Sequence, residues 1–186
     1  MKNIVIVGAG DLGKEVVWLI EDINKKEPTY LIMGFLDDNP SKKGQEFYGY
    51  KILGGTDLLK SLSEKVPLYA VVAIQDGSIR RKIVEAHPEF TRWESIIHPM
   101  AVIASSSTVG CGSIFFPHTT VSVDTNAGKF GLYYINSTVC NDCRIGDYVS
   151  VMSGALVSER SIVGDGCQIS AGHIVDPHKQ VTKHRV

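Results

Sequence analysis

Residues 133–163 read YYINSTVCNDCRIGDYVSVMSGALVSERSIV, with an apolar residue at every sixth position. The same spacing continues in both directions, from Ile97 to Val181, without a break. A period of six fits neither the 3.6-residue period of an α-helix nor the two-residue alternation of a flat strand. It is typical of a chain that turns a corner every six residues. The sequence therefore predicts a hexapeptide β-helix of about five coils over residues 96–186.

Three hexapeptides complete one coil, so residues eighteen apart are expected to stack. β-branched side chains suit such ladders, because each packs against a like residue above and below it. A short residue also stands four positions after each apolar one, except at His173 and Lys179 in the last coils. The three predicted inward stacks are Ile103, Val121, Val139, Val157 and Val175; Val109, Ala127, Ile145, Val163 and Val181; and Ile97, Phe115, Tyr133, Val151 and Ile169.

The first part of the chain has a different pattern, in which short apolar runs alternate with helical segments. Strands are expected at residues 2–7, 29–36, 51–53 and 68–74. Helices are expected after the first strand, at 56–63 with Thr56 as the N-cap, and at 78–86. Alternating strands and helices with short links predict a parallel sheet. We therefore expect a Rossmann-like α/β domain over residues 1–95.

A glycine-rich loop, Gly8-x-Gly10-x-x-Gly13, follows the first strand and opens the first helix. Glycines let the backbone approach a phosphate, and the helix N-terminus favours an anion. Asp37 and Asp38 close the second strand, where a ribose or base can be recognised. The alternatives are a tight turn without a ligand and an NAD(P)-binding module, although a dehydrogenase needs a larger sheet and a catalytic domain.

Composition narrows the functional classes. A net charge of −1 over 186 residues argues against a general nucleic-acid-binding surface. No apolar run is long enough to span a membrane, and the N-terminus has no signal-peptide layout. Together with four cysteines, these features predict a cytoplasmic protein with reduced thiols. Cys140 and Cys143 have a zinc-like spacing, but β-helix geometry makes a four-thiolate site improbable, so no metal is expected.

The combination of the two halves resembles the bacterial sugar O- and N-acyltransferases of the sialic-acid O-acetyltransferase type. The matching strings are residues 6–10 (IVGAG), 34–38 (GFLDD), 72–74 (VAI), 97–103 (IHPMAVI) and 143–147 (CRIGD). The resemblance implies a left-handed β-helix, a homotrimer and acetyl-CoA as co-substrate. It also implies acetylation of a nucleotide-linked sugar in surface-glycan synthesis, without a metal or nucleic acid.

The same resemblance implies site residues in both domains. The nucleotide-sugar is expected at Gly8, Gly10, Asp37, Asp38 and Ile74. Acetyl-CoA is expected at Ser150, Gly154 and Ala171. In this family a histidine removes a proton from the attacking sugar group, and backbone amides stabilise the oxyanion.

The expected catalytic histidine is replaced in this chain. Asn141 stands at its position and Asp142 follows. A neutral amide does not accept a proton at physiological pH. Asp142 is the remaining candidate base, a role that requires burial because an exposed carboxylate is a weak base. A neighbouring subunit could instead supply His118 or His173. The alternative is a catalytically silent relative that binds a nucleotide-sugar or scaffolds a trimer.

The chain stops at Val186, one residue before the next position of the six-residue frame. The last coil therefore has no recognisable cap in the sequence, which leads us to expect a longer natural chain or a disordered tail.

Overall fold

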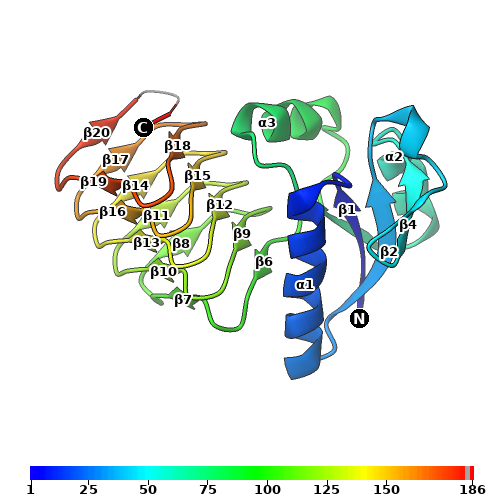
Figure 1. Ribbon diagram of the computed structural model, residues 1–186, viewed down its shortest axis with the longest axis horizontal. Helices are drawn as coiled ribbons and strands as arrows, with labels where there is room; N and C mark the ends of the chain where they lie inside the picture. Colours follow the sequence, from blue (N-terminus) through cyan, green and yellow to red (C-terminus); the bar gives the residue numbers. More distant parts are fainter. Residues whose placement is uncertain (183–184) are drawn as a thin grey trace. The chain divides into compact units, whose positions relative to one another are not determined.

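The computed structural model describes residues 1–182 and 185–186. The chain forms two compact units, one of residues 1–75 and 79–96 and the other of residues 76–78 and 97–186 (Figure 1). The first unit contains β1 (Lys2–Val7), α1 (Asp11–Lys26), β2 (Tyr30–Leu36), the 3-10 helix η1 (Pro40–Lys42), β3 (Glu46–Phe47), β4 (Tyr50–Gly54), α2 (Leu58–Lys65), β5 (Leu68–Val72) and most of α3 (Gly77–Ala86).

A five-stranded sheet of order β3-β4-β2-β1-β5 forms the centre of the first unit. β4, β2, β1 and β5 are parallel, and β3 adds an antiparallel edge through a hairpin with β4. β1 is buried from Ile4 to Val7, as a central parallel strand between covered faces must be. The expected α/β sheet is confirmed, and the hairpin is an addition that the sequence analysis missed.

The start of α2 corrects one expectation. Asp57, not Thr56, is the N-cap residue, and no side chain caps this helix. The Thr56 hydroxyl instead donates a hydrogen bond to Asp38, which ties α2 to the loop after β2. The sequence pattern shows only that Thr56 could cap the helix that follows it. In the structure the carboxylate of Asp38, eighteen residues earlier, accepts the hydrogen bond of the Thr56 hydroxyl instead.

The described residues of the second half hold fifteen two-residue strands that wind into a left-handed parallel β-helix (Figure 1). These are β6 (Ile96–Ile97), β7 (Val102–Ile103), β8 (Thr108–Val109), β9 (Ile114–Phe115), β10 (Thr120–Val121), β11 (Asn126–Ala127), β12 (Leu132–Tyr133), β13 (Thr138–Val139), β14 (Arg144–Ile145), β15 (Ser150–Val151), β16 (Leu156–Val157), β17 (Ile162–Val163), β18 (Gln168–Ile169), β19 (Ile174–Val175) and β20 (Gln180–Val181).

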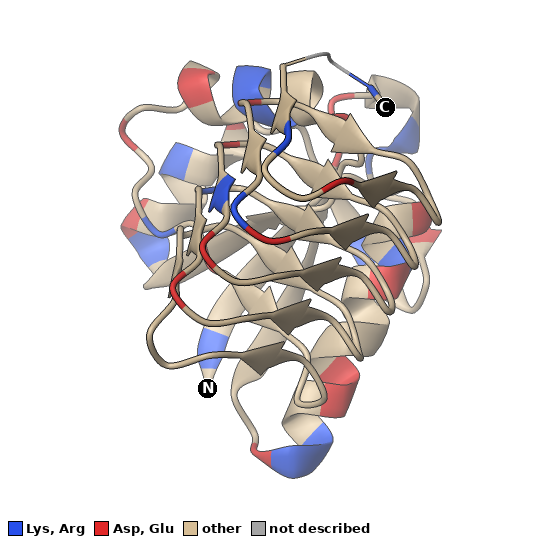
Figure 2. Cartoon of the chain, turned by 90° about the vertical axis from the view of Figure 1, so that its left-hand side faces the viewer, with Lys and Arg blue, Asp and Glu red and all other residues tan. Residues whose placement is uncertain are grey.

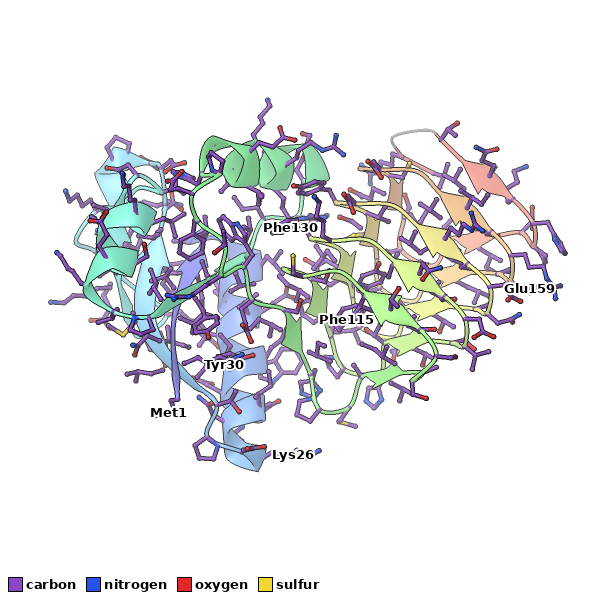
Figure 3. The ribbon with its side chains drawn as sticks, turned by 180° about the vertical axis from the view of Figure 1, so that it is seen from behind. Met1, Lys26, Tyr30, Phe115, Phe130 and Glu159 are labelled. Atoms are coloured by element: carbon purple, nitrogen blue, oxygen red, sulfur yellow. The ribbon has the colours of Figure 1, made fainter. Side chains whose placement is uncertain are left out.

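Three parallel sheets form the sides of the coils, in the orders β19-β16-β13-β10-β7, β20-β17-β14-β11-β8 and β18-β15-β12-β9-β6. Each predicted stack of apolar residues lies in one sheet with an eighteen-residue register. Val139, for example, pairs with Val121 and Val157, and its side chain is fully buried. Phe115 and Tyr133 stack with ring centroids 4.5 Å apart (Phe115 is labelled in Figure 3).

Ile97 departs from the predicted stacks, because 38% of it is exposed while its neighbour Ile96 is fully buried. Ile103 and Val109 in the first coil are also only partly buried. A ladder residue is covered by like residues in the coils on either side, and the first coil has such a neighbour on one side only.

Several of the short polar residues four positions after the apolar ones close the coils with hydrogen bonds, whereas the buried hydroxyl of Ser137 has no partner among the described residues. Thr125 Oγ1 donates to the carbonyl oxygen of Cys140 at 2.7 Å, and Ser161 Oγ donates to that of Asp176 at 3.0 Å. These side chains are buried, so an apolar replacement would leave inward backbone carbonyls with one partner fewer. The sequence pattern of short polar residues thus has a hydrogen-bonding cause as well as a steric one.

From residue 112 to residue 178, each corner of the coils places one residue in the left-handed region of backbone space. This residue stands three positions after the inward apolar residue, as in Asp124 (φ 55°), Asp142 (φ 59°) and Arg160 (φ 55°). Such a φ costs a non-glycine residue roughly 1 kcal/mol. The backbone N–H at the corner offsets part of this cost, because it donates a hydrogen bond to the preceding coil, from Asp142 to the carbonyl of Val123 at 3.1 Å and from Asp124 to the hydroxyl of Ser106 at 3.1 Å.

Candidate functional site

Two of the three glycines after β1 are required by the protein's own packing. Gly8 has φ 108°, and a Cβ there would lie 2.7 Å from the carbonyl oxygen of Ala73. A Cβ on Gly13 would collide with the carbonyl oxygen of Gly8. Gly10 differs, because no atom lies within 4 Å of the place its Cβ would take. The missing side chain at Gly10 therefore leaves open space at the start of α1, where no side chain caps the helix.

Asp37 holds the glycine loop against the end of β2. Its Oδ2 accepts a hydrogen bond from the backbone N–H of Ala9 at 3.0 Å and pairs with Lys42 Nζ at 2.7 Å. Its Oδ1 accepts from the N–H of Asn39 at 3.0 Å. Burial acts to raise the pKa of the Asp37 carboxyl, but Lys42 and the two N–H groups outweigh it, so this pKa lies below its ordinary value.

Asp38 is also engaged within the protein. Its Oδ1 accepts from the N–H of Thr56 at 2.7 Å, and its Oδ2 accepts from the Thr56 hydroxyl at 3.2 Å. Thr56 is buried. Asp37 and Asp38, which the sequence predicted to bind the ligand, thus hold the loop around the site through their own hydrogen bonds. Only the remaining lone pairs of their carboxylate oxygens are left to accept a hydrogen bond from a ligand.

Two cavities open at the carboxyl ends of β1, β2 and β5, the position at which open α/β sheets bind ligands. Gly8, Asp37 and Ile74 line both of them. The first, about 360 Å³, is lined mainly by aliphatic side chains and is completed by Val7, Leu36, Asp38, Asn39, Thr56, Ile79, Lys82 and Ile83. The second, about 350 Å³, lies along the glycine loop and is completed by Ala9, Gly10, Asp11, Leu12, Lys42, Ala73 and Gln75.

Arg80 fixes the wall that the two cavities share. Its side chain is almost fully buried, and its Nη1 donates to the carbonyl oxygens of Ile74 at 2.9 Å and Gln75 at 2.7 Å. These carbonyls follow β5, where the strand has ended and no neighbouring strand pairs with them. The guanidinium therefore sets the course of the chain at Ile74.

The candidate catalytic pair lies at a corner of the β-helix, between β13 and β14. Asn141 Nδ2 donates to Asp142 Oδ2 at 2.8 Å, and Arg160 Nε lies 3.6 Å from the same oxygen. The Asp142 side chain is 42% exposed. Charged residues gather at the corners of the coils (Figure 2). Glu159 lies at the outer edge of the β-helix (Figure 3). Within this chain, the burial that a carboxylate base requires is absent at Asp142.

The three residues expected to hold acetyl-CoA lie on neighbouring coils. Ser150 is buried in β15, and Gly154 occupies the next corner with φ 67°. Ala171 is exposed one coil later, beside Gly172, whose N–H donates to the carbonyl of Ser153. A separate groove of about 380 Å³ runs over the outer face of β11, β14 and β17. Its lining residues are Asn126, Arg144, Ile145, Gly146, Ile162, Val163, Gly164 and Asp165, and none of the three expected residues is among them.

The candidate histidines of the β-helix, His118 and His173, are exposed. His118 occupies a left-handed corner with φ 61°.

The thiols of Cys140 and Cys143 are free, and burial raises the pKa of both, which disfavours the thiolate. Residues 1–182 and 185–186 contain no cluster of three or more His, Cys, Asp or Glu side chains suited to a metal ion. No helix in this part of the chain is long and apolar enough to cross a membrane.

The structure adds site residues that sequence reasoning missed. Lys42, Lys82 and Arg80 all carry positive charge to the cavities or their shared wall. Of these three, only Lys82 could have been found from the sequence, since Ile79, Lys82 and Ile83 have the spacing of residues on one helix face. Lys42 and Arg80 act through contacts with residues of other segments, which no local sequence pattern predicts.

Comparison with known proteins supports the resemblance noted in the sequence. Residues 3–87 match the PglD N-terminal domain family. No curated protein sequence matches the chain significantly.

Solved structures that share the fold over nearly the whole chain include the following three. The acetyltransferase domain of PglB from Neisseria gonorrhoeae, in complex with acetyl coenzyme A, is 25% identical, with a TM-score of 0.79 over 96% of this chain and 93% of that one. A histidine-to-asparagine variant of perosamine N-acetyltransferase from Caulobacter crescentus, in complex with CoA and GDP-perosamine, is 23% identical, with a TM-score of 0.78 over 98% and 92%. WeeI from Acinetobacter baumannii is 23% identical, with a TM-score of 0.70 over 98% and 95%.

Residues 3–87 are thus similar to the PglD N-terminal domain, and the chain as a whole has the fold of these bacterial sugar acetyltransferases.

Proposed function

We propose that this protein transfers the acetyl group of acetyl-CoA to the amino group of a nucleotide-linked sugar. The observation that carries the proposal is the pair of cavities at Gly8, Asp37 and Ile74, set in a PglD-type domain that continues into a β-helix. The nucleotide-sugar occupies these cavities, with its base in the aliphatic one. Acetyl-CoA binds to the β-helix near Ser150, Gly154 and Ala171. Two of the relatives described above were solved with ligands, one with acetyl-CoA and the other with CoA and GDP-perosamine.

The reaction needs a nucleophile, an acceptor for one proton and a stabilised oxyanion. The sugar amine attacks the thioester carbonyl, a C–N bond forms, and the C–S bond to CoA breaks. The CoA thiolate is a good leaving group, so the demanding step is removal of the proton from the attacking amine. Asp142 is the side chain next to Asn141 that can accept it, and closure by substrate or by another subunit would supply the burial that the role requires.

Asn141 does not by itself argue against ligand binding. The Caulobacter enzyme holds CoA and GDP-perosamine when one of its histidines is replaced by asparagine. An amide at such a position is therefore compatible with occupied substrate sites in a protein of this fold. What the amide removes is a proton acceptor, whose contribution to rate is roughly a hundred- to ten-thousandfold.

A second candidate is a binding protein that holds a nucleotide-sugar without acetylating it. The observation that favours it is the corner itself, where Asn141 replaces an imidazole and Asp142 is exposed beside Arg160. A homotrimer is proposed under both candidates. In an active trimer a neighbouring subunit could bring His118 or His173 to this corner, so the oligomeric state measured by light scattering bears directly on the choice. A cytoplasmic location is proposed with either function.

The test is release of CoA thiol from acetyl-CoA with a panel of UDP-, GDP-, CMP- and dTDP-linked amino sugars. Turnover with one of them is expected, and Asp142→Asn should abolish it. Asp124→Asn is the matched control, because Asp124 is exposed and has the same left-handed backbone one coil earlier. Binding without turnover would establish the second candidate. Turnover that survives Asp142→Asn would reject Asp142 as the base, and preferred binding of NAD(H) would reject both candidates.

A further inference from the structure

Lys82 lines the aliphatic cavity, and the described residues give its ammonium group no hydrogen-bond or ion-pair partner. Lys82 lies on α3 and lines the cavity with Ile79 and Ile83. Among residues 1–182 and 185–186, no side chain or carbonyl forms a hydrogen bond or ion pair with it. Lys42, by contrast, is held by the Ala9 carbonyl and Asp37. An ammonium carries three donors and no acceptor, so Lys82 remains available to a carbonyl or anionic oxygen of a ligand.

The rest of the cavity suits a flat heterocycle better than a phosphate. Val7, Leu36 and Ile74 supply apolar walls from the ends of β1, β2 and β5, and the isoleucines of α3 line the cavity with them. Asp37 and Asp38 both line this cavity with Lys82, and Lys42 neutralises Asp37, so the two carboxylates and the two ammonium groups leave no excess positive charge for a diphosphate. An uncharged base instead buries its faces against the aliphatic side chains.

We infer that Lys82 selects the base of the nucleotide, favouring bases with a carbonyl beside a ring N–H, which are uracil, thymine and guanine. This inference rests on the proposed function. The ammonium donates to the base carbonyl, O4 of uracil or thymine or O6 of guanine. The remaining lone pairs of the carboxylates accept the adjacent ring N–H. Cytosine and adenine place an amino donor where the carbonyl would be, so the ammonium would face a donor.

Titration calorimetry of the whole chain with UDP, GDP, CDP and ADP tests this assignment. The unmodified protein should bind UDP or GDP roughly ten- to a hundredfold more tightly than CDP and ADP, the discrimination typical of one well-placed base contact. Lys82→Met, which keeps side-chain length and helix propensity, should remove most of this preference. Lys82→Arg should restore part of it. Lys60→Met is the matched control, because Lys60 is an exposed helical lysine that lines neither cavity.

Uridine and guanosine, which lack phosphates, distinguish the remaining outcomes. If Lys82→Met weakens all four nucleotides equally and leaves the nucleosides unchanged, Lys82 binds phosphate and the inference is wrong. It is also wrong if Lys82→Met leaves the base preference intact while the protein still binds nucleotides, a result that would preserve the proposed function. Failure of the unmodified protein to bind any nucleotide would instead reject the nucleotide site itself. Circular dichroism of each variant confirms that it is folded.

Discussion

Replacement of Asp37 by asparagine tests whether this carboxylate is a structural clamp on the glycine loop. The carboxylate accepts from two backbone N–H groups and pairs with Lys42 at 2.7 Å, with a side chain only 15% exposed. Asparagine keeps the shape but has one acceptor oxygen, so it must lose the bonds on one side. Hydrogen bonds to a charged group contribute roughly 1.5–3 kcal/mol each. Discounting the exposed part of Lys42, we expect Asp37→Asn to lower the free energy of unfolding by roughly 2–3 kcal/mol.

Urea unfolding followed by tryptophan fluorescence measures this change, because Trp18 and Trp93 are the chain's two tryptophans and both lie in the first unit. The folded pKa of Asp37 lies below its unfolded value, so its contribution to stability is present above about pH 4 and is lost as the pH falls through the folded pKa. The difference between the two proteins should therefore shrink in acid. Asp11→Asn, whose side chain is 97% exposed, is the control. A shift below about 0.5 kcal/mol at neutral pH, or one that does not decrease as the pH falls below about 4, would refute the clamp.

Three further predictions concern other parts of the molecule. Val139→Asp places an unpaired charge in a fully buried stack, so it should unfold the neighbouring coils and lower the β-sheet signal in circular dichroism, whereas Val139→Ile should not. Asn141→His should raise turnover by roughly a hundredfold or more in the CoA-release assay; no increase would mean that the loss of activity lies elsewhere. Gly13→Ala should destabilise the first unit because its Cβ meets the Gly8 carbonyl, while Gly10→Ala, with open space, should fold normally and weaken ligand binding only, as thermal melting and calorimetry would show.

The β-helix could be predicted almost completely from the sequence because its order is local and repeated. An inward residue every six positions fixes the corners, and the eighteen-residue stacks follow from three sides per coil. Val139 pairs with Val121 and Val157, as the separation of eighteen residues per coil requires. The prediction was wrong at Ile97, where the repeat continues but the coil that would cover it is missing on one side.

The glycine loop and the acidic pair after β2 were likewise recognised in sequence, since their spacing follows from a strand that leads into a helix. Their individual roles were not recognisable. Asp37 and Asp38 look alike in sequence, yet one holds Ala9 and Lys42 while the other holds Thr56.

Spacing along the chain was thus enough to predict the repeat, the inward residues and the place of the glycine loop, because these depend on neighbours at fixed separations. The folded structure was needed to find that Arg80 fixes the wall at Ile74, that Lys42 neutralises Asp37, and that Lys82 lines a cavity without a partner among the described residues. Those contacts join segments brought together by the packing of the sheet and its helices. Their energies depend on burial and on distances of a few ångströms, which spacing along the chain does not encode.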